Sequence, residues 1–195
     1  MKNNLVSKSL ENYLLNKLNV KKIENTELEK IEEITLNAMD ENGNRYDYDF
    51  KDFKKITNLK YLSLQNFIIN NYETNEINRC KNLKGVQFSN CIIKSKSRLQ
   101  NNIKVISFNN CKKFKIYYIS LLKNLQILKL INQKIVNIFY ITNLKNLEKI
   151  YFENTWILNF RKLKELKSLL YIRLIKCKWN KFGQKYLENR IEIEK

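Results

Sequence analysis

The sequence has no proline, no histidine and only three glycines in 195 residues. Proline and glycine mark linkers and chain breaks, so their scarcity argues against disordered linkers and favours one continuously stacked domain. Without histidine the chain lacks the usual base for a serine or cysteine nucleophile, and no glycine-rich phosphate-binding loop occurs. The glutamates beyond the acidic start are scattered rather than paired. The composition therefore predicts a protein that is not an enzyme and uses no cofactor.

Long apolar runs are also missing. No stretch approaches the 18 apolar residues of a membrane-spanning helix, and the start, MKNNLVSKSLENYLLNKL, lacks the apolar run of a secretion signal. We therefore expect a cytoplasmic protein that does not bind membranes, and we expect it to be a monomer.

One apolar pattern recurs along the chain in seven copies spaced 28, 24, 20, 22, 22 and 22 residues apart. In the stretch KNLQILKLINQKI, apolar residues stand at relative positions 1, 4, 6 and 11, with position 1 at Leu125 and position 11 at Ile135. Positions 4 and 6 of the seven copies are Ile34/Leu36, Leu62/Leu64, Val86/Phe88, Ile106/Phe108, Leu128/Leu130, Ile150/Phe152 and Ile172/Leu174. This spacing alternates like a short strand, so positions 4 and 6 point inward while positions 3, 5 and 7 point outward.

The pattern resembles that of the leucine-rich repeat family, L-x-x-L-x-L-x-x-N/C-x-L, over roughly residues 31–179. The spacing of 22 residues and the N-L-x-x-L phrasing are most similar to the bacterial, internalin-like branch. The resemblance implies an α/β solenoid of about seven coils, with a parallel sheet on the concave side and short helical, 3-10 or irregular segments on the convex side. One departure concerns position 9, which never carries the family's asparagine. Asparagine stands at position 8 instead, as Asn66, Asn90, Asn110, Asn132 and Asn154.

Both ends of such a stack need a cap, because a terminal coil exposes its apolar face. Apolar residues at helical spacing predict an amphipathic helix near residues 5–18, and Thr26 with Glu29 predicts a capping box. A second helix is expected over the last repeat, from the spacing of Trp179, Phe182, Tyr186 and Leu187. The expected parts are an N-terminal helical cap at 1–30, repeats at 31–178 and a C-terminal cap at 179–195.

Two features suggest metal sites but favour other interpretations. Cys91, Cys111 and Cys177 all occupy position 9 and Cys80 falls in an apolar slot, so we expect all four in the core rather than on zinc. The spacing of Asp40, Asn42 and Asn44 is typical of a calcium loop, but the glycine is misplaced and Lys51 stands where a bidentate glutamate belongs. An Asn-Gly turn in an acidic loop is the preferred interpretation.

The net charge of +18 is unevenly distributed. Residues 1–52 hold 8 basic and 11 acidic side chains, whereas residues 53–195 hold 29 basic and 8 acidic ones. Between Ile77 and Leu147 there are 14 lysines or arginines and no acidic residue. A charged region of one sign favours an oppositely charged partner.

Several lysines share repeat positions and should form rows along one edge of the sheet, because neighbouring strands lie about 4.7–4.9 Å apart. One row is at position 2 and the other lies two residues before position 1. This predicted basic edge consists of Lys60, Lys84 and Lys104, and of Lys81, Lys123, Lys145 and Lys167.

The outward strand positions change character along the chain. Serine, glutamine and asparagine dominate the first half, whereas the second half carries apolar, aromatic and basic residues, which are unfavourable there unless something covers them. The predicted partner-binding residues are Ile127, Lys129, Ile131, Lys149, Tyr151, Tyr171, Arg173 and Ile175. A competing interpretation is that the C-terminal tail folds over this end. On the convex side, Tyr117/Tyr118 and Phe139/Tyr140 could stack bases or pack between coils.

Two functions remain open. The first is a binding module whose concave face engages an acidic protein or a ribonucleoprotein as an inhibitor or regulator. The second is direct binding of an RNA or DNA backbone along the lysine edge, which the ratio of 31 lysines to 6 arginines favours over base reading. The resemblance and the acidic first 52 residues favour the first.

Overall fold

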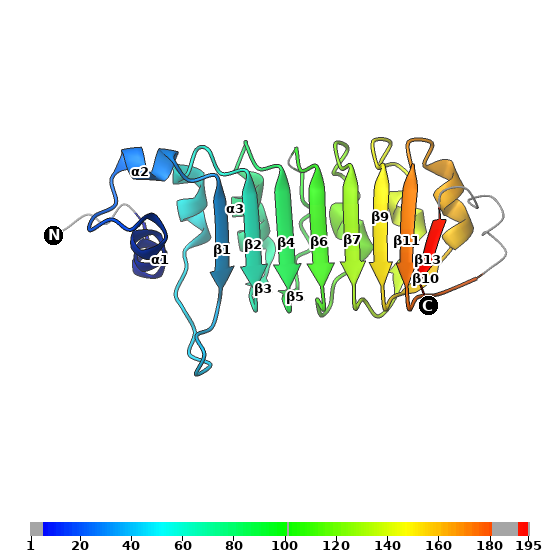
Figure 1. The fold of residues 1–195 in the computed structure, drawn as a ribbon, viewed down its shortest axis with the longest axis horizontal. Coiled ribbons are helices and arrows are strands. Elements are labelled where there is room, and N and C mark those ends of the chain that lie inside the picture. The colour runs from blue at the N-terminus through cyan, green and yellow to red at the C-terminus, as the bar shows by residue number, and fades with distance from the viewer. Residues whose placement is uncertain (1–5, 101, 181–190, 195) are drawn as a thin grey trace.

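The computed structural model describes residues 6–100, 102–180 and 191–194, which wind into a row of stacked coils. Each coil contributes one strand to a parallel sheet, whose order along the stack is β1-β2-β4-β6-β7-β9-β11-β13 (Figure 1). The strands are β1 Glu33–Asn37, β2 Tyr61–Gln65, β4 Gly85–Ser89, β6 Val105–Asn109, β7 Ile127–Ile131, β9 Lys149–Glu153, β11 Tyr171–Ile175 and β13 Ile191–Glu194.

The register of this sheet follows the repeat positions of the sequence. Position 5, for example, forms a continuous row from Thr35 on β1 to Arg173 on β11. Inward and outward residues therefore line up from coil to coil, and the predicted parallel sheet with aligned outward positions is confirmed.

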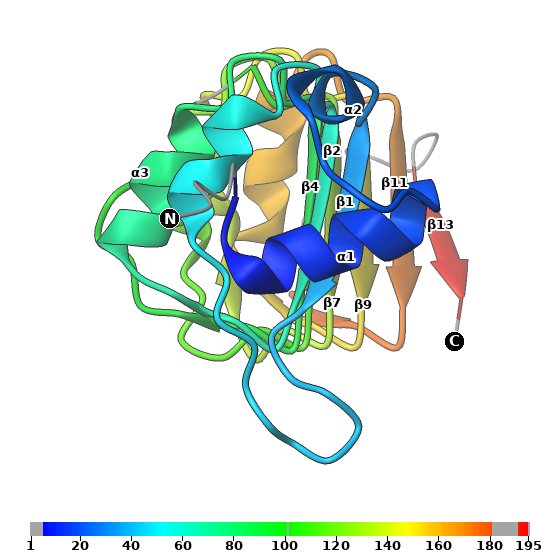
Figure 2. The same cartoon turned by 90° about the vertical axis from the view of Figure 1, so that its left-hand side faces the viewer.

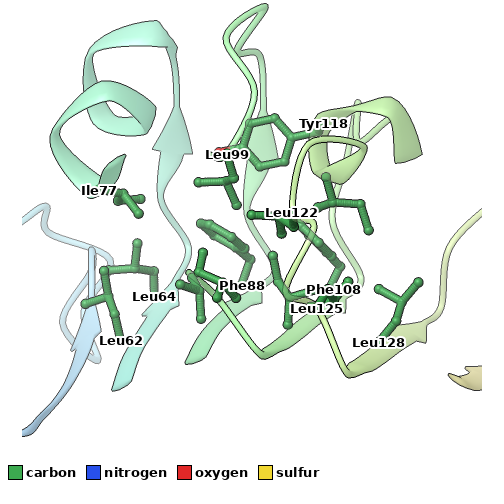
Figure 3. Close-up of a cluster of buried hydrophobic side chains, with 14 of the residues drawn as sticks. Leu62, Leu64, Ile77, Phe88, Leu99, Phe108, Tyr118, Leu122, Leu125 and Leu128 are labelled. Carbon is green, nitrogen blue, oxygen red and sulfur yellow. The ribbon is translucent and has the colours of Figure 1, made fainter. Parts of the chain in front are cut away.

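The core lies between the sheet and the convex side and runs without a break along the stack. Positions 1, 4 and 6 of the repeats supply it, joined by convex-side residues such as Ile77 and Tyr118 (Figure 3). Phe88 and Phe108, at position 6 of adjacent coils, stack with ring centres 5.1 Å apart. Each fully buried aliphatic or aromatic side chain contributes about 1.5–3 kcal/mol, and only stacking achieves that burial.

The convex side consists of one short α-helix and several 3-10 helices. The 24-residue copy has room for an α-helix, α3 Asn71–Asn78, which opens with a capping box formed by Asn70 and Glu73. The 20-residue copy that follows has no helix on this side. The other segments are the 3-10 helices η1 Phe50–Lys55, η2 Ile116–Ile119, η3 Ile138–Ile141 and η4 Phe160–Glu165.

Two small sheets lie where the coils turn from the main sheet toward the convex side. One pairs β3 Ile68–Ile69 with β5 Ile92–Ile93, and the other runs β12-β10-β8, from Lys178–Trp179 through Trp156–Leu158 to Val136–Asn137. The second sheet corrects one prediction. Ile135 is not a core residue, since 47% of it is exposed, and the next residue, Val136, is buried and pairs in register with Ile157. This coil therefore turns inward one residue later than the repeat pattern predicts.

The N-terminal end of the stack is closed by helix α1, Lys8–Leu18, which lies across the open side of the first coil (Figure 2). Its buried Leu10 and Leu14 cover core residues that would otherwise face water. A shorter helix, α2 Asn25–Glu29, follows. The predicted capping box at Thr26 is wrong, because α2 already begins at Asn25 and the Thr26 hydroxyl bonds to the side chain of Glu27.

A helix is expected over the last repeat, and of the four residues that predict it the structure describes only Trp179. Trp179 belongs to strand β12 and is half-buried, while Phe182, Tyr186 and Leu187 lie outside the described residues. Strand β13 pairs in parallel with β11 and extends the main sheet by one strand (Figure 1). The described tail therefore lies beside the last repeat strand.

Two ladders run along the turn that follows the strands. The asparagines at position 8 adopt a left-handed backbone, with φ between 44° and 63°, a conformation that asparagine tolerates better than most residues. Position 9 supplies the hydrogen bonds to the backbone. The Cys91 thiol, the Gln133 amide and the Thr155 hydroxyl each reach the position-7 carbonyl of their own coil and the position-6 carbonyl of the coil before. Cysteine, glutamine and threonine thus satisfy the buried carbonyls that a position-9 asparagine would satisfy.

The position-9 ladder yields a stability prediction at Thr155, whose hydroxyl lies 2.8 Å from the Glu153 carbonyl and 3.3 Å from that of Leu130. Thr155→Val keeps the shape but leaves these buried groups without a partner, so it should lower the free energy of unfolding by about 1–3 kcal/mol. Urea denaturation measures the change. Thr57→Val, at an exposed threonine, is the control, and equal stability of the two variants would contradict the role of the ladder.

The four cysteines are free, and Cys80, Cys91 and Cys111 are buried while Cys177 is half-buried. Burial and the nearby Glu76 carboxylate raise the pKa of the Cys80 thiol to about 12. At pH 8 Cys80 is therefore almost entirely the thiol, whereas the thiolate is the form that reacts.

An aromatic disulfide reagent at pH 8 should therefore label at most the half-buried Cys177 quickly, and should label all four thiols after denaturation. Absorbance of the released thiolate counts the reactive groups. Fast labelling of more than one cysteine in the folded protein would show that the thiols are not core residues, and Cys177→Ser identifies the one that reacts.

Candidate functional site

The second half of the concave face brings a basic and aromatic cluster together. Lys129, Tyr151 and Arg173 occupy position 5 of three adjacent strands and are neighbours in register. The Lys129 ammonium lies 5.5 Å from the centre of the Tyr151 ring, and that ring lies 5.6 Å from the ring of Tyr171. A cation over an aromatic face and paired aromatic rings are contacts that stabilise an ordered surface.

Two further rows flank this cluster. Ile127 and Lys149 precede Tyr171 at position 3, and Ile131 and Ile175 occupy position 7 on either side of Glu153. The concave cluster is defined as the eight predicted residues Ile127, Lys129, Ile131, Lys149, Tyr151, Tyr171, Arg173 and Ile175. Lys129 and Lys149 are exposed and the other six are half-buried.

The competing interpretation is that the C-terminal tail folds over the second half of the concave face. Strand β13 continues the sheet at its edge and places Glu192 beside Arg173 in register. Both Tyr171 and Arg173 take part in further contacts. Since no member of the concave cluster is fully buried, the tail leaves all eight residues at least partly accessible.

The first half of the concave face contains a hollow of about 370 Å³ that sequence reasoning missed. Its lining is small at Ser63, Gly85 and Ser107, and Lys129 borders it on the side of the concave cluster. The half-exposed Tyr61 ring leans over Gly85 from the neighbouring strand. The hollow is therefore continuous with the concave cluster, and the missing side chain of Gly85 is the sequence signal that could have indicated it.

The lysine rows lie where the strands begin. Lys60, Lys84 and Lys104 succeed one another in adjacent coils, linked by backbone hydrogen bonds, but the row continues as Gln126, Glu148 and Leu170. Lys60 pairs with Glu32. The other row holds Lys81, Lys123, Lys145 and Lys167, all exposed, and the sequence interrupts it at Asn101. The first predicted row therefore ends at Lys104, and the second is interrupted between Lys81 and Lys123.

A second hollow, of about 780 Å³, opens at this edge beside Lys81. Its floor is apolar, with Phe53 and Leu59, while Lys54 and Arg79 add positive charge. Arg79 is paired with the buried Glu76 carboxylate. The hollow therefore joins an apolar surface to the basic edge beside Lys81.

The convex aromatic pairs do not behave alike. Tyr118 is buried and its hydroxyl lies 3.0 Å from that of Thr74, so it packs between coils. Phe139 and Tyr140 are both exposed, with ring centres 6.0 Å apart. The packing interpretation is correct for Tyr118, and the exposed pair leaves base stacking possible at Phe139 and Tyr140.

The Asp40 loop is a turn held by its own polar groups. The Asp40 carboxylate accepts hydrogen bonds from the Asn44 side chain and from the Asn44 and Asn42 backbone amides, which lower the pKa of that carboxyl. The Gly43 amide donates to the Asp40 carbonyl and Gly43 has a φ of 82°, so the glycine is the left-handed residue that ends a turn over Asp40–Gly43. Among residues 6–100, 102–180 and 191–194, no group of three or more histidines, cysteines, aspartates or glutamates could hold a metal ion.

Comparison with solved structures gives a match over nearly the whole chain. The crystal structure of internalin C2 from Listeria monocytogenes superposes with a TM-score of 0.59 and 13% identity, covering 95% of this chain and 73% of that one. The protein has an internalin-like leucine-rich repeat fold. A second Listeria monocytogenes internalin matches with a TM-score of 0.38 and 12% identity, covering 96% of this chain and 75% of that one. No family model matches the sequence, and no curated protein does.

The likeness establishes the leucine-rich repeat fold alone. Within the described part of the chain no helix is long and apolar enough to cross a membrane. The surface features that stand out on the repeat scaffold are the concave cluster, the hollow beside it and the basic edge.

The contact between Gly85 and Tyr61 predicts a coupled effect on stability. A Cβ at position 85 would lie 2.6 Å from the Tyr61 Cδ1 atom. Gly85→Ala should therefore destabilise the protein by about 1–3 kcal/mol because the ring must move. Combined with Tyr61→Ala, the same change should stabilise the strand by about 0.5–1 kcal/mol, since alanine has less chain entropy to lose than glycine.

Thermal or urea denaturation of the four proteins in this mutant cycle measures the coupling. Equal effects of Gly85→Ala in both backgrounds would show that the ring does not rest on the glycine.

Proposed function

We propose that this leucine-rich repeat protein is a non-enzymatic binding protein that uses its concave cluster to bind an acidic surface of another macromolecule. The observation that carries the proposal is the row of Lys129, Tyr151 and Arg173 on three adjacent strands. Aromatic residues and arginine are the side chains most often found at the centres of protein interfaces.

The apolar members of the cluster support a protein partner. Ile127, Ile131 and Ile175 are half-buried at outward strand positions. Their apolar surface there remains partly in contact with water, which is unfavourable. A partner that covers them removes apolar surface from water at about 25 cal/mol per Å². The concave curvature of a solenoid provides an extended surface for such a partner.

Charge favours an acidic partner. The stretch from Ile77 to Leu147 carries 14 basic and no acidic side chains, and the lysine rows lie at the edge of the same sheet. Charge complementarity of this kind accelerates encounter and excludes partners of like charge. Glu153, which lies between Ile131 and Ile175 in the sheet, would repel an acidic group placed directly over it. We therefore expect the partner's acidic residues opposite Lys129, Lys149 and Arg173.

A small basic solenoid with no catalytic group acts by occupying a surface. We therefore infer that it inhibits or regulates a protein or ribonucleoprotein whose acidic site it covers. Direct binding of a nucleic-acid backbone is the second candidate, favoured by the exposed Lys81, Lys123, Lys145 and Lys167. That mode would depend steeply on salt and little on sequence.

The double variant Tyr151→Ala/Arg173→Glu tests the proposal. It removes the aromatic anchor and reverses one charge, so it should abolish capture of the partner in affinity purification from the native host, with and without nuclease. Circular dichroism should remain unchanged because neither side chain is fully buried.

Tyr72→Ala/Lys96→Glu is the matched control, since both residues are exposed and lie outside the concave strands. It should leave the partner bound. Retained capture by the concave variant would reject the concave cluster as the site, and capture lost only after nuclease treatment would favour the nucleic-acid candidate.

A further inference from the structure

A third hollow, of about 360 Å³, lies at the opposite edge of the sheet from the lysine rows, past the ends of β7, β9 and β11. In Figure 1 this edge is marked by the arrowheads. The hollow is lined by Lys134, Lys176 and Lys178 together with Trp156, and by the side chains of Asn132 and Asn154. None of these six residues belongs to the concave cluster or to the basic edge.

Trp156 is one of the large apolar side chains that the structure leaves exposed, with 50% of it accessible. It lies on β10 and its register partner on β12 is Lys178. The large tryptophan surface is strongly stabilised by burial or by stacking with another flat ring. A ligand that covers the exposed part of the ring would remove this surface from water.

The three lysines make the hollow strongly positive. All are exposed, and none has an acidic partner within the described residues. Along the strand ends, Glu153 and Glu194 are both register partners of Ile175, the residue before Lys176, and Glu153 stands at an outward position of the concave face. Like charges gathered this closely repel one another, and an anion relieves that repulsion.

Lys176 has a left-handed backbone conformation, which is energetically unfavourable for lysine. It has a φ of 49° at position 8, where five earlier coils have asparagine. The left-handed region is uncommon for lysine, and the turn of the repeat imposes it at this position.

The substitution of lysine for asparagine at position 176 also ends the side-chain ladder. The Asn154 amide donates to the Asn132 Oδ1 at 2.9 Å, but no described residue donates to the Asn154 Oδ1. An acceptor is thereby left open in the hollow, where it can take a hydrogen bond from a ligand.

From this arrangement we propose that the hollow, the lysine-tryptophan site, binds a nucleotide unit, with its phosphates on the three lysines and its base stacked on Trp156. Lysine ammonium groups suit phosphate as point charges, whereas planar carboxylates are matched better by arginine, which is absent here. A base has the flat ring that tryptophan stacks with and the N–H groups that the Asn154 Oδ1 can accept from. The site is independent of the concave cluster.

Fluorescence of Trp156 tests the site directly. In a Trp179→Phe background Trp156 is the one tryptophan left, and a base stacked on it should quench its emission. The probes are adenosine triphosphate, a short single-stranded oligoadenylate, inorganic triphosphate and a polyglutamate peptide of the oligoadenylate's charge. Tighter binding of the oligoadenylate than of adenosine triphosphate would identify a strand as the source of the nucleotide, and equal binding would identify the free nucleotide.

Lys134→Glu/Lys178→Glu should weaken binding of the better nucleotide probe at least about tenfold, because it reverses two of the three phosphate contacts. Trp156→Ala should weaken it about fivefold or more, measured by anisotropy of a labelled probe. Lys84→Glu/Lys104→Glu on the other edge is the control with the same charge change and should alter binding less than about twofold. Thermal melting checks that the exposed substitutions leave the fold intact.

Three results would overturn the assignment. One is equal weakening by the Lys84/Lys104 control, which would indicate diffuse attraction to the whole basic surface. Another is polyglutamate binding as tightly as the nucleotides, and the third is an absence of quenching by both nucleotides. Inorganic triphosphate that binds without quenching and more weakly than the nucleotides is the result expected if both the phosphates and the base are recognised. Failure here leaves the concave cluster untouched, since the variants of the two tests share no residue.

Discussion

The structure depends on satisfying the backbone carbonyls at the turn that follows each strand. These carbonyls are buried between coils, and a buried acceptor without a donor costs about 1–3 kcal/mol. Every coil from the third to the sixth places a position-9 side chain there, and the donor is in turn a thiol, a thiol, an amide and a hydroxyl. Because each donor reaches both its own coil and the one before, the same hydrogen bonds that close a turn also set the stacking register.

That register has consequences for the surface. Once inward positions are aligned, outward positions are aligned as well, so residues 22 apart in sequence become neighbours about 4.8 Å apart. Lys129, Tyr151 and Arg173 form a surface for this reason, and Lys178 comes to lie beside Trp156 in the same way. Solenoids build extended surfaces from such rows, and the charge of each row is set by one residue per coil.

The distribution of charge separates the molecule into an acidic start and a basic body. Acidic residues of the first part are engaged locally: Asp52 is buried against Lys55 and accepts from the Ser7 amide, while Asp49 binds Lys51 and Tyr72. Basic residues of the later coils have few such partners, because the stretch from Ile77 to Leu147 contains no acidic residue. Several acidic side chains of the cap and the first coil are thus paired locally, whereas the charge of the later coils remains directed to solvent or to a partner.

The sequence by itself determined the number and spacing of the coils, the inward and outward positions of each strand and the placement of cysteines in apolar slots. These follow from a strict local period, since apolar residues at positions 1, 4 and 6 can be buried only in one register. The tertiary structure alone decided the features that depend on contacts between coils. Val136 rather than Ile135 enters the core because its coil turns inward one residue later than the repeat pattern predicts. Strand β13 joins the sheet because β11 offers an unpaired edge. The hollows at Gly85 and at Trp156 exist because the side chains of adjacent strands do not fill that space. A periodic sequence specifies where a side chain points, whereas the space in front of it is set by the neighbouring coils.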